Sequence, residues 1–187
     1  MAADALIAWS DEIECEGGPV LVANAEDFAH WFGNAGELGH EAVRAFGPGC
    51  TGYLWNAIPG SVRVTVDAGR AALWLTQIEY AEDDAGRAAA LACALAFDGL
   101  QEAPGMHYRV TKGPLVVAWA ANSVSNTSTS IARLPLAGDS PGALIDFAGG
   151  PNAAALWLAP GVYASSLFFH EEDRWGISRC RLLRLSD

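Results

Sequence analysis

Glycine- and proline-containing turns divide this chain into many short apolar segments, and that spacing limits the chain to a β-rich fold. The segment "SVRVTV" has the alternation of a half-buried strand, because Val62, Val64 and Val66 face one side. Turns such as Pro59-Gly60 predict that neighbouring strands form antiparallel hairpins. The predicted strands cover residues 12–23 (two short strands), 51–58, 61–66, 71–80, 106–111, 114–121, 130–136, 143–147, 154–159, 162–169 and 175–185.

Two short helices are predicted near the N-terminus. Asn24 can cap the first, and Phe28, Trp31 and Phe32 have the spacing of its apolar face. The second covers residues 38–46 and would be ended by the Gly-Pro-Gly that follows it.

The main helix is predicted over residues 84–97, with Asp83 or Asp84 as its cap. It is apolar on all sides over most of its length, which predicts burial across a sheet face. The expected fold class is therefore α+β, with mostly antiparallel β meanders in two related halves, one main buried helix and two short N-terminal helices.

Two pairs of similar segments suggest an internal repeat. "GGPVLVANAED" at 17–27 and "KGPLVVAWAAN" at 112–122 share Gly-Pro followed by three apolar residues. "AALWL" occurs at 71–75 and again at 154–158. Such repeats usually indicate paired structural units, although chance similarity in a chain rich in Ala and Leu is the alternative. The predicted organisation is a single domain, 1–187, with possible halves 12–100 and 106–185.

The negative charge of the chain is concentrated in its N-terminal part. The formal net charge is −11; residues 1–105 contain 16 acidic and 4 basic side chains, whereas residues 106–187 contain 6 acidic and 7 basic ones. This distribution disfavours nucleic acid and anionic membranes as partners. It favours a basic protein partner, whose encounter it would accelerate, while solubility alone is the alternative explanation.

Acidic side chains occur in three groups that could contact such a partner. One group alternates along a predicted strand, one lies in the first turn of the first helix, and the segment "YAEDD" precedes the main helix. The candidate residues for binding this basic partner are Glu12, Glu14, Glu16, Glu26, Asp27, Glu79, Glu82, Asp83 and Asp84. Helix capping, complementation of the helix dipole and protection of a strand edge from aggregation also explain these groups.

Catalytic and metal-binding motifs are not found in the sequence. It has no GxSxG, HExxH, P-loop or GxGxxG pattern, so we expect neither an enzyme nor a cofactor. The four cysteines lack metal-ligand spacing and are expected to be free thiols. His170 is followed by Glu171, Glu172 and Asp173, but consecutive residues of a hairpin point in different directions, so we predict a solvated turn without a metal.

The chain is expected in the cytoplasm. No apolar run is long enough to span a bilayer, and the N-terminal "MAADALIAWSDE" lacks the basic region of a secretory signal. The sequence does not indicate an oligomeric state.

Four segments in order resemble strands of one known family. "EIECEGGPVLV", "LWLTQIEYAEDD", "YRVTKGPLVVAWAAN" and "LWLAPGVYASSLFF" resemble successive strands of the immunity protein 21 family of bacterial polymorphic toxin systems. The resemblance covers roughly residues 12–185, with Glu12 standing where the family pattern has Trp. It implies a small, cytoplasmic, non-enzymatic protein that binds and neutralises a cognate toxin domain. Because toxin nucleases act on a polyanion, such a toxin is expected to be basic and its inhibitor acidic.

Two other functions are compatible with the residues. One is a β-rich domain that binds a small ligand of unknown identity, with Trp55, Trp74 and Trp157 lining a pocket between the two halves. The other is an enzyme whose site carries no recognised motif.

Overall fold

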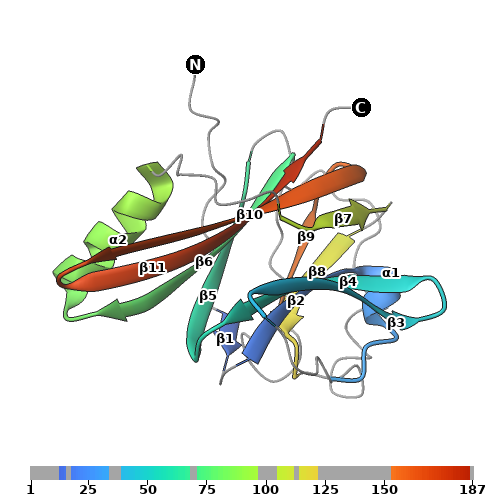
Figure 1. Cartoon of the computed structure of the whole chain (residues 1–187), viewed down its shortest axis with the longest axis horizontal. Coiled ribbons are helices and arrows are strands. Elements are labelled where there is room, and N and C mark those ends of the chain that lie inside the picture. Colours follow the sequence, from blue (N-terminus) through green and yellow to red (C-terminus); the bar gives the residue numbers. More distant parts are fainter. Residues whose placement is uncertain are drawn as a thin grey trace.

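The computed structural model of the chain contains two antiparallel sheets that pack face to face (Figure 1). Each sheet carries one helix on its outer face. The structure describes residues 13–15, 18–33, 39–67, 71–96, 105–111, 114–121 and 153–185. These residues contain eleven strands and two helices, and neither helix is long and apolar enough to cross a membrane. The mostly antiparallel β architecture predicted from the turns is confirmed.

The first sheet has six strands, and each neighbouring pair is antiparallel. Its order is β1 (Ile13–Cys15), β5 (Gly60–Val66), β6 (Ala72–Ala81), β11 (Trp175–Arg184), β10 (Gly161–Glu172) and β7 (His107–Val110). The long strands β6, β10 and β11 extend beyond the second sheet, at the left of Figure 1. One end of this sheet is therefore not covered by the other sheet.

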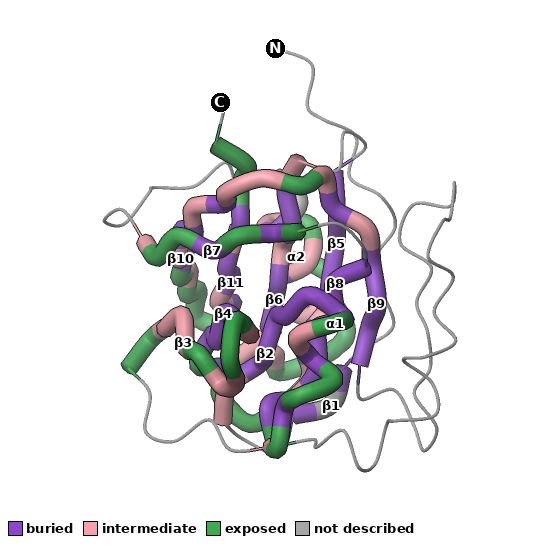
Figure 2. Tube along the Cα trace, turned by 90° about the vertical axis from the view of Figure 1, so that its right-hand side faces the viewer, coloured by how far each residue is buried: buried purple, intermediate pink, exposed green. Residues whose placement is uncertain are grey.

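The second sheet has five strands, also antiparallel. Its order is β3 (Glu41–Gly47), β4 (Cys50–Ala57), β2 (Gly18–Asn24), β8 (Pro114–Trp119) and β9 (Ala153–Trp157). The central strand β2 is buried on both faces from Val20 to Ala23, as its continuous apolar run predicts. Figure 2 shows the contrast with the edge strand β3, which is only partly buried.

The main core lies between the two sheets and is built from alternate residues of their strands. Val62, Val64 and Val66 of β5 point into it, as their alternation predicts, and Val20 and Val22 of β2 enter it from the second sheet. Burial of apolar surface between the sheets provides most of the driving force for this arrangement.

Helix α1 (Ala25–Phe28) covers the outer face of the five-stranded sheet. Phe28 and Trp31 are buried there, and Trp31 Nε1 donates a hydrogen bond to the Ala120 carbonyl oxygen at 2.8 Å. The prediction that Phe32 belongs to this apolar face is wrong, because its side chain is 81% exposed. The helix ends after four residues, so the helical spacing between Phe28 and Phe32 is not maintained.

The second predicted N-terminal helix, over residues 38–46, is also wrong. Residues 41–47 form strand β3, which pairs with β4 so that Val43 lies opposite Tyr53. The Gly-Pro-Gly interpreted as the end of a helix is the turn of this hairpin, and Gly49 adopts a φ of 75° there. Hydrogen bonds to β4, which local propensity does not reveal, determine the strand conformation.

The turn at Pro59-Gly60 does not form the predicted hairpin. It carries the chain from β4 in one sheet to β5 in the other. The fully buried Gln77 of β6 holds this crossing, because its side-chain amide accepts a hydrogen bond from Ile58 N at 3.0 Å and donates one to Ile58 O at 2.7 Å. The buried Gln77 side chain thus provides hydrogen bonds for the backbone N–H and C=O groups of Ile58, where the chain leaves one sheet.

Helix α2 (Asp84–Ala96) lies across β6 and β11 on the outer face of the six-stranded sheet (Figure 1). Ala90 and Ala94 pack against Ile177, which confirms the predicted position on a sheet face. The prediction of a fully buried helix is wrong, because one side of α2 faces solvent. The exposed apolar residues on that side are Ala85, Ala88, Ala89 and Ala92. Alanine exposes little apolar area, so the sequence pattern overstated the burial.

Strands from the two predicted halves meet at the centre of both sheets. In the six-stranded sheet β6 pairs with β11, and in the five-stranded sheet the two Gly-Pro strands β2 and β8 pair. Val22 and Val117, at the same position of the Gly-Pro pattern, lie opposite each other. The two "AALWL" segments do not occupy equivalent positions in the fold, because the first copy belongs to β6 and the second to β9 in the other sheet.

The predicted strands 130–136 and 143–147 lie outside the described residues.

A buried polar contact joins the two sheets at Tyr53. Its hydroxyl donates a hydrogen bond to the Glu41 carboxylate and lies 3.0 Å from Cys180 Sγ on β11. Burial raises the pKa of Tyr53, so the hydroxyl keeps its proton.

We expect Tyr53→Phe to lower the free energy of unfolding by about 1–2 kcal/mol, because a buried hydrogen bond is lost while the ring still fills its site. Urea unfolding measures the change. Tyr80→Phe, at an exposed position, is the matched control and should have a smaller effect. Equal losses in the two variants would contradict the role of Tyr53.

Candidate interaction surface

Six exposed carboxylates gather at the end of the six-stranded sheet that extends beyond the second sheet. We call this group the acidic tip; its members are Glu82, Asp83, Asp84, Glu171, Glu172 and Asp173. Glu82 and Asp83 connect β6 to α2, which begins at Asp84. Glu171 and Glu172 end β10, and Asp173 lies in the turn before β11. The antiparallel pairing of β6 with β11 therefore joins two acidic segments that are distant in the sequence.

Backbone pairing and one tyrosine hold the two segments together. Glu82 N donates to the Arg174 carbonyl oxygen at 3.1 Å. Tyr80 OH makes contacts of 3.0 Å to Glu171 Oε1 and 2.8 Å to the Glu172 carbonyl oxygen. Tyr80 lies beside Gly176, where an added Cβ would lie 2.7 Å from its ring, so glycine allows this close approach.

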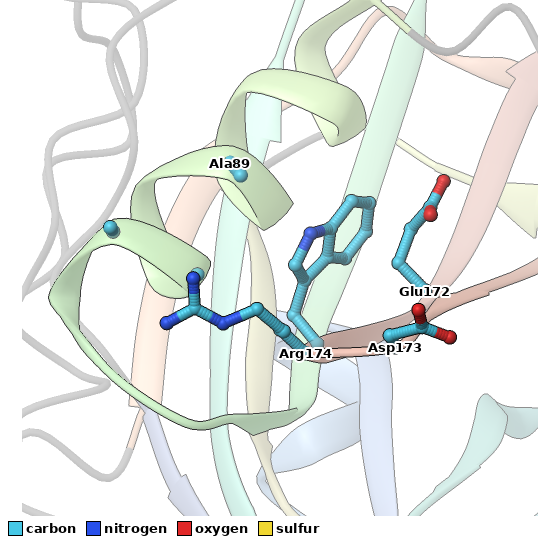
Figure 3. Close-up of a pocket in the computed structure, with 7 residues that line it drawn as sticks. Ala89, Glu172, Asp173 and Arg174 are labelled. Atoms are coloured by element: carbon cyan, nitrogen blue, oxygen red, sulfur yellow. The ribbon is translucent and has the colours of Figure 1, made fainter.

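Arg174 partly neutralises the acidic tip. Its guanidinium donates to Glu82 Oε2 at 3.2 Å and also to the Asp83 carboxylate. The hydrogen bond to Glu82 and the charges of both carboxylates raise the pKa of Arg174. Figure 3 shows the Arg174 side chain extending towards α2, whereas the carboxylates of Glu172 and Asp173 point away from it. A single guanidinium among six carboxylates leaves an exposed negative surface.

Asp83 is the N-cap of α2. Its Oδ1 accepts a hydrogen bond from Gly86 N at 2.8 Å, which confirms one of the two predicted caps. This backbone hydrogen bond, together with the nearby Arg174 guanidinium, lowers the pKa of Asp83 below its usual value of 3.8. The aspartate therefore shapes the acidic tip and also begins the helix beside it.

We expect Asp83→Ala to lower the melting temperature at about pH 7, with a difference from the unmodified protein that shrinks on acidification. A carboxyl with a lower pKa in the folded state stabilises the fold above its unfolded pKa, and that contribution is lost as the pH falls through the folded value. Thermal unfolding between about pH 7 and about pH 2 measures the trend. Glu26→Ala, in the first turn of α1, is the control; a pH-independent difference for Asp83→Ala would contradict the assignment.

Exposed aromatic side chains accompany the carboxylates. Phe169 of β10 is 54% exposed and Tyr80 is 38% exposed. A hollow of about 270 Å³ lies between the first turn of α2 and the β10–β11 turn, and Trp175 and Arg174 contribute to its lining (Figure 3). Carboxylates and aromatic rings together can bind Arg and Lys side chains by ion pairing and cation–π contact.

The structure divides the predicted toxin-binding residues among separate places. Exposed Glu26 and half-buried Asp27 lie on α1, at the opposite end of the molecule from α2 in Figure 1. The Asp27 carboxylate is also engaged in hydrogen bonds within the protein, because it accepts one from Thr51 N at 3.4 Å and one from Asn24 Nδ2 at 3.3 Å. Glu79 is half-buried near the end of β6, next to the acidic tip.

The predicted row of Glu12, Glu14 and Glu16 is only partly covered by the structure. Glu12 and Glu16 lie outside the described residues, and Glu14 lies in the short edge strand β1. The sequence predicts Glu171, Glu172 and Asp173 only as a solvated turn. Their position in the same surface as Glu82 was therefore missed by the sequence analysis. The only sequence signal for them is the polar segment "HEEDRWG" between two predicted strands. Which other segments lie beside that hairpin depends on the order of strands in the sheet, and this order is not evident from the sequence.

The three tryptophans predicted to line a pocket do not come together. Trp55 is buried in the core between the sheets. Trp74 alternates with the core residues Leu73 and Leu75, so it faces outward from the six-stranded sheet. Trp157 is the end residue of β9 and follows the core residue Leu156, so it faces away from that core.

Comparison with models of known protein families, with curated proteins and with solved structures gives no match to this chain. Within the described ranges, no three His, Cys, Asp or Glu side chains are placed to share a metal ion. The acidic tip is therefore defined by its own geometry, as an exposed surface suited to a positively charged partner.

Proposed function

We propose that this chain is a cytoplasmic immunity protein that binds a basic bacterial toxin domain at the acidic tip and thereby neutralises it. The observation that supports the proposal best is the convergence of the "YAEDD" segment and the "HEEDRWG" hairpin at one end of the molecule. The sequence resemblance implies the same function, and one of its four segments, "LWLTQIEYAEDD", contains the acidic-tip residues Glu82, Asp83 and Asp84.

The acidic tip has the features that speed recognition of a basic protein. All six carboxylates are exposed, so they act on a partner at a distance before contact. Exposed ion pairs contribute little affinity individually, so binding also needs apolar contacts. Phe169 and Tyr80 provide these beside the charges, and aromatic side chains are frequent energetic centres of interfaces.

Growth rescue tests the proposal. The C-terminal domain of any toxin-like protein encoded beside this gene is expressed in a bacterial host with and without the full chain. We expect the chain to restore growth and to co-purify with the toxin domain. Restored growth without co-purification, or toxicity that persists despite expression of the folded chain, would contradict a binding inhibitor.

A small-ligand-binding domain remains the second candidate function, but the pocket predicted for it is not formed by Trp55, Trp74 and Trp157. Instead, Trp74 lies beside two arginines on the outer face of the six-stranded sheet. That arrangement of two cations over one ring is the observation that favours a ligand.

We also propose that the two halves are copies of one structural unit. The strand order β1-β5-β6 is mirrored by β7-β10-β11, and the pair β2-β4 is mirrored by β8-β9. An experimental structure should superimpose these two sets by a rotation of about 180° around the Val22–Val117 pair. A different strand order in the second set would contradict the relationship.

A further inference from the structure

An unusual group of side chains lies on the outer face of the six-stranded sheet, away from the acidic tip. Thr65, Trp74 and Arg181 are opposite one another on β5, β6 and β11. In the neighbouring row Thr76 lies opposite Arg179. Because side chains alternate along strands, these five residues share one face of the sheet.

Two guanidinium groups of this face, those of Arg179 and Arg181, lie over the same indole ring. The Arg179 guanidinium carbon is 4.2 Å from the Trp74 ring centre, and that of Arg181 is 5.2 Å from it. Cation–π attraction stabilises each contact. It cannot remove the repulsion between two positive charges that are held over one ring.

Arg179 is buried without full hydrogen bonding. Its side chain is 2% exposed, its Nε donates to Thr76 Oγ1 at 3.0 Å, and its Nη1 donates to the Ala94 carbonyl oxygen near the end of α2. Its Nη2 is buried and has no hydrogen-bond partner. Burial, followed by the charge of Arg181, lowers the pKa of Arg179 to about 10. A buried cation without an anionic partner is costly.

Two further buried polar atoms on this face also have no partner. They are Arg181 Nε and Thr65 Oγ1. Among the described residues, no carboxylate forms an ion pair or hydrogen bond with Arg179 or Arg181. Guanidinium N–H groups can only donate, so the group that would satisfy them must be an acceptor, and preferably negatively charged.

We propose that Arg179, Arg181 and Thr65 form a binding site for a small oxyanion, either a phosphate or a carboxylate. Guanidinium groups recognise both chemistries through paired N–H donors, which matches the unsatisfied Arg179 Nη2 and Arg181 Nε. The Thr65 hydroxyl supplies a third donor. The site neither contains nor contacts the residues of the acidic tip, so it does not depend on the proposed function.

Thermal unfolding and calorimetric titration of the full chain test the site. The protein is dialysed into chloride buffer and titrated with inorganic phosphate, and separately with acetate, at constant ionic strength. We expect at least one of the two anions to bind with saturation and to raise the melting temperature, since a ligand that binds the folded state stabilises it. The two titrations distinguish a phosphate site from a carboxylate site. If neither anion binds, the proposal is overturned.

Variants locate the binding. Arg181→Gln removes a half-buried guanidinium and should weaken the observed binding at least about tenfold. Arg109→Gln removes one positive charge from an exposed position of β7 in the same sheet, and it should bind like the unmodified protein. Equal affinity of the unmodified protein and Arg181→Gln would overturn the site. The titrations of the unmodified protein remain decisive if a variant fails to fold.

Discussion

Replacing Asn24 by alanine is expected to lower the free energy of unfolding by about 3 kcal/mol. This residue lies at the end of β2 with 4% of its surface exposed. Its Nδ2 donates to Tyr108 OH at 3.1 Å and to the Arg109 carbonyl oxygen at 3.3 Å, while its Oδ1 accepts from Thr111 N at 2.9 Å. The side chain therefore joins the central strand of one sheet to the edge strand of the other. Alanine would leave these partners unsatisfied in a site that water cannot readily reach.

Asn56→Ala is the matched control for Asn24→Ala. Asn56 is exposed on β4, and its loss should change the free energy of unfolding by no more than about 0.5 kcal/mol. Urea unfolding of both variants measures the difference. Similar values for the two asparagines would show that the contacts of Asn24 do not hold the sheets together.

Reversing three charges of the acidic tip is expected to slow association with a basic toxin domain by about 10- to 100-fold at low ionic strength. The variant combines Asp84→Lys, Glu172→Lys and Asp173→Lys. It leaves Asp83 in place, so the cap of α2 is retained. Because dissolved salt screens exposed charges, the difference from the unmodified protein should shrink at high ionic strength. Stopped-flow association at several salt concentrations measures both effects.

Single substitutions separate the position of a charge from the net charge. Asp173→Lys and Glu26→Lys alter the net charge equally, but only Asp173 belongs to the acidic tip. We expect Asp173→Lys to slow association more than Glu26→Lys does. If the two variants associate at the same rate, the overall charge steers the partner and the acidic tip has no special role.

Local sequence patterns were sufficient for much of the fold. The alternation of Val62, Val64 and Val66 requires no knowledge of neighbouring strands, and these side chains do enter the core. Strand β3 was mistaken for a helix because its conformation depends on pairing with β4. The destination of the chain after Pro59 likewise depends on Gln77, a residue of a later strand.

Asn24 illustrates how a correct local observation led to the wrong role. An asparagine before Ala25 has the position of a helix cap, but its side chain makes no capping hydrogen bond to α1. It bonds instead to the segment around Tyr108, which is 84 residues away in the sequence. Such a contact follows from the packing of the sheets and has no local signal.

The two candidate sites show the same limitation. Glu82 and Glu171 stand in acidic segments that are visible in the sequence, but the register of β6 and β11 brings them together. Arg179 and Arg181 alternate with apolar residues, which is the pattern of a strand face exposed to solvent. The structure shows Arg179 buried instead, so its missing hydrogen-bond partner could be recognised only in the folded chain.

Hydrogen exchange of the full chain, alone and with the toxin domain that it rescues growth from, tests most directly whether the acidic tip is the binding surface. We predict that the complex protects backbone amides at residues 80–86 and 169–176, and leaves those of α1 at residues 25–28 unchanged. Protection confined to α1, or no protection anywhere in the presence of the toxin domain, would contradict the assignment.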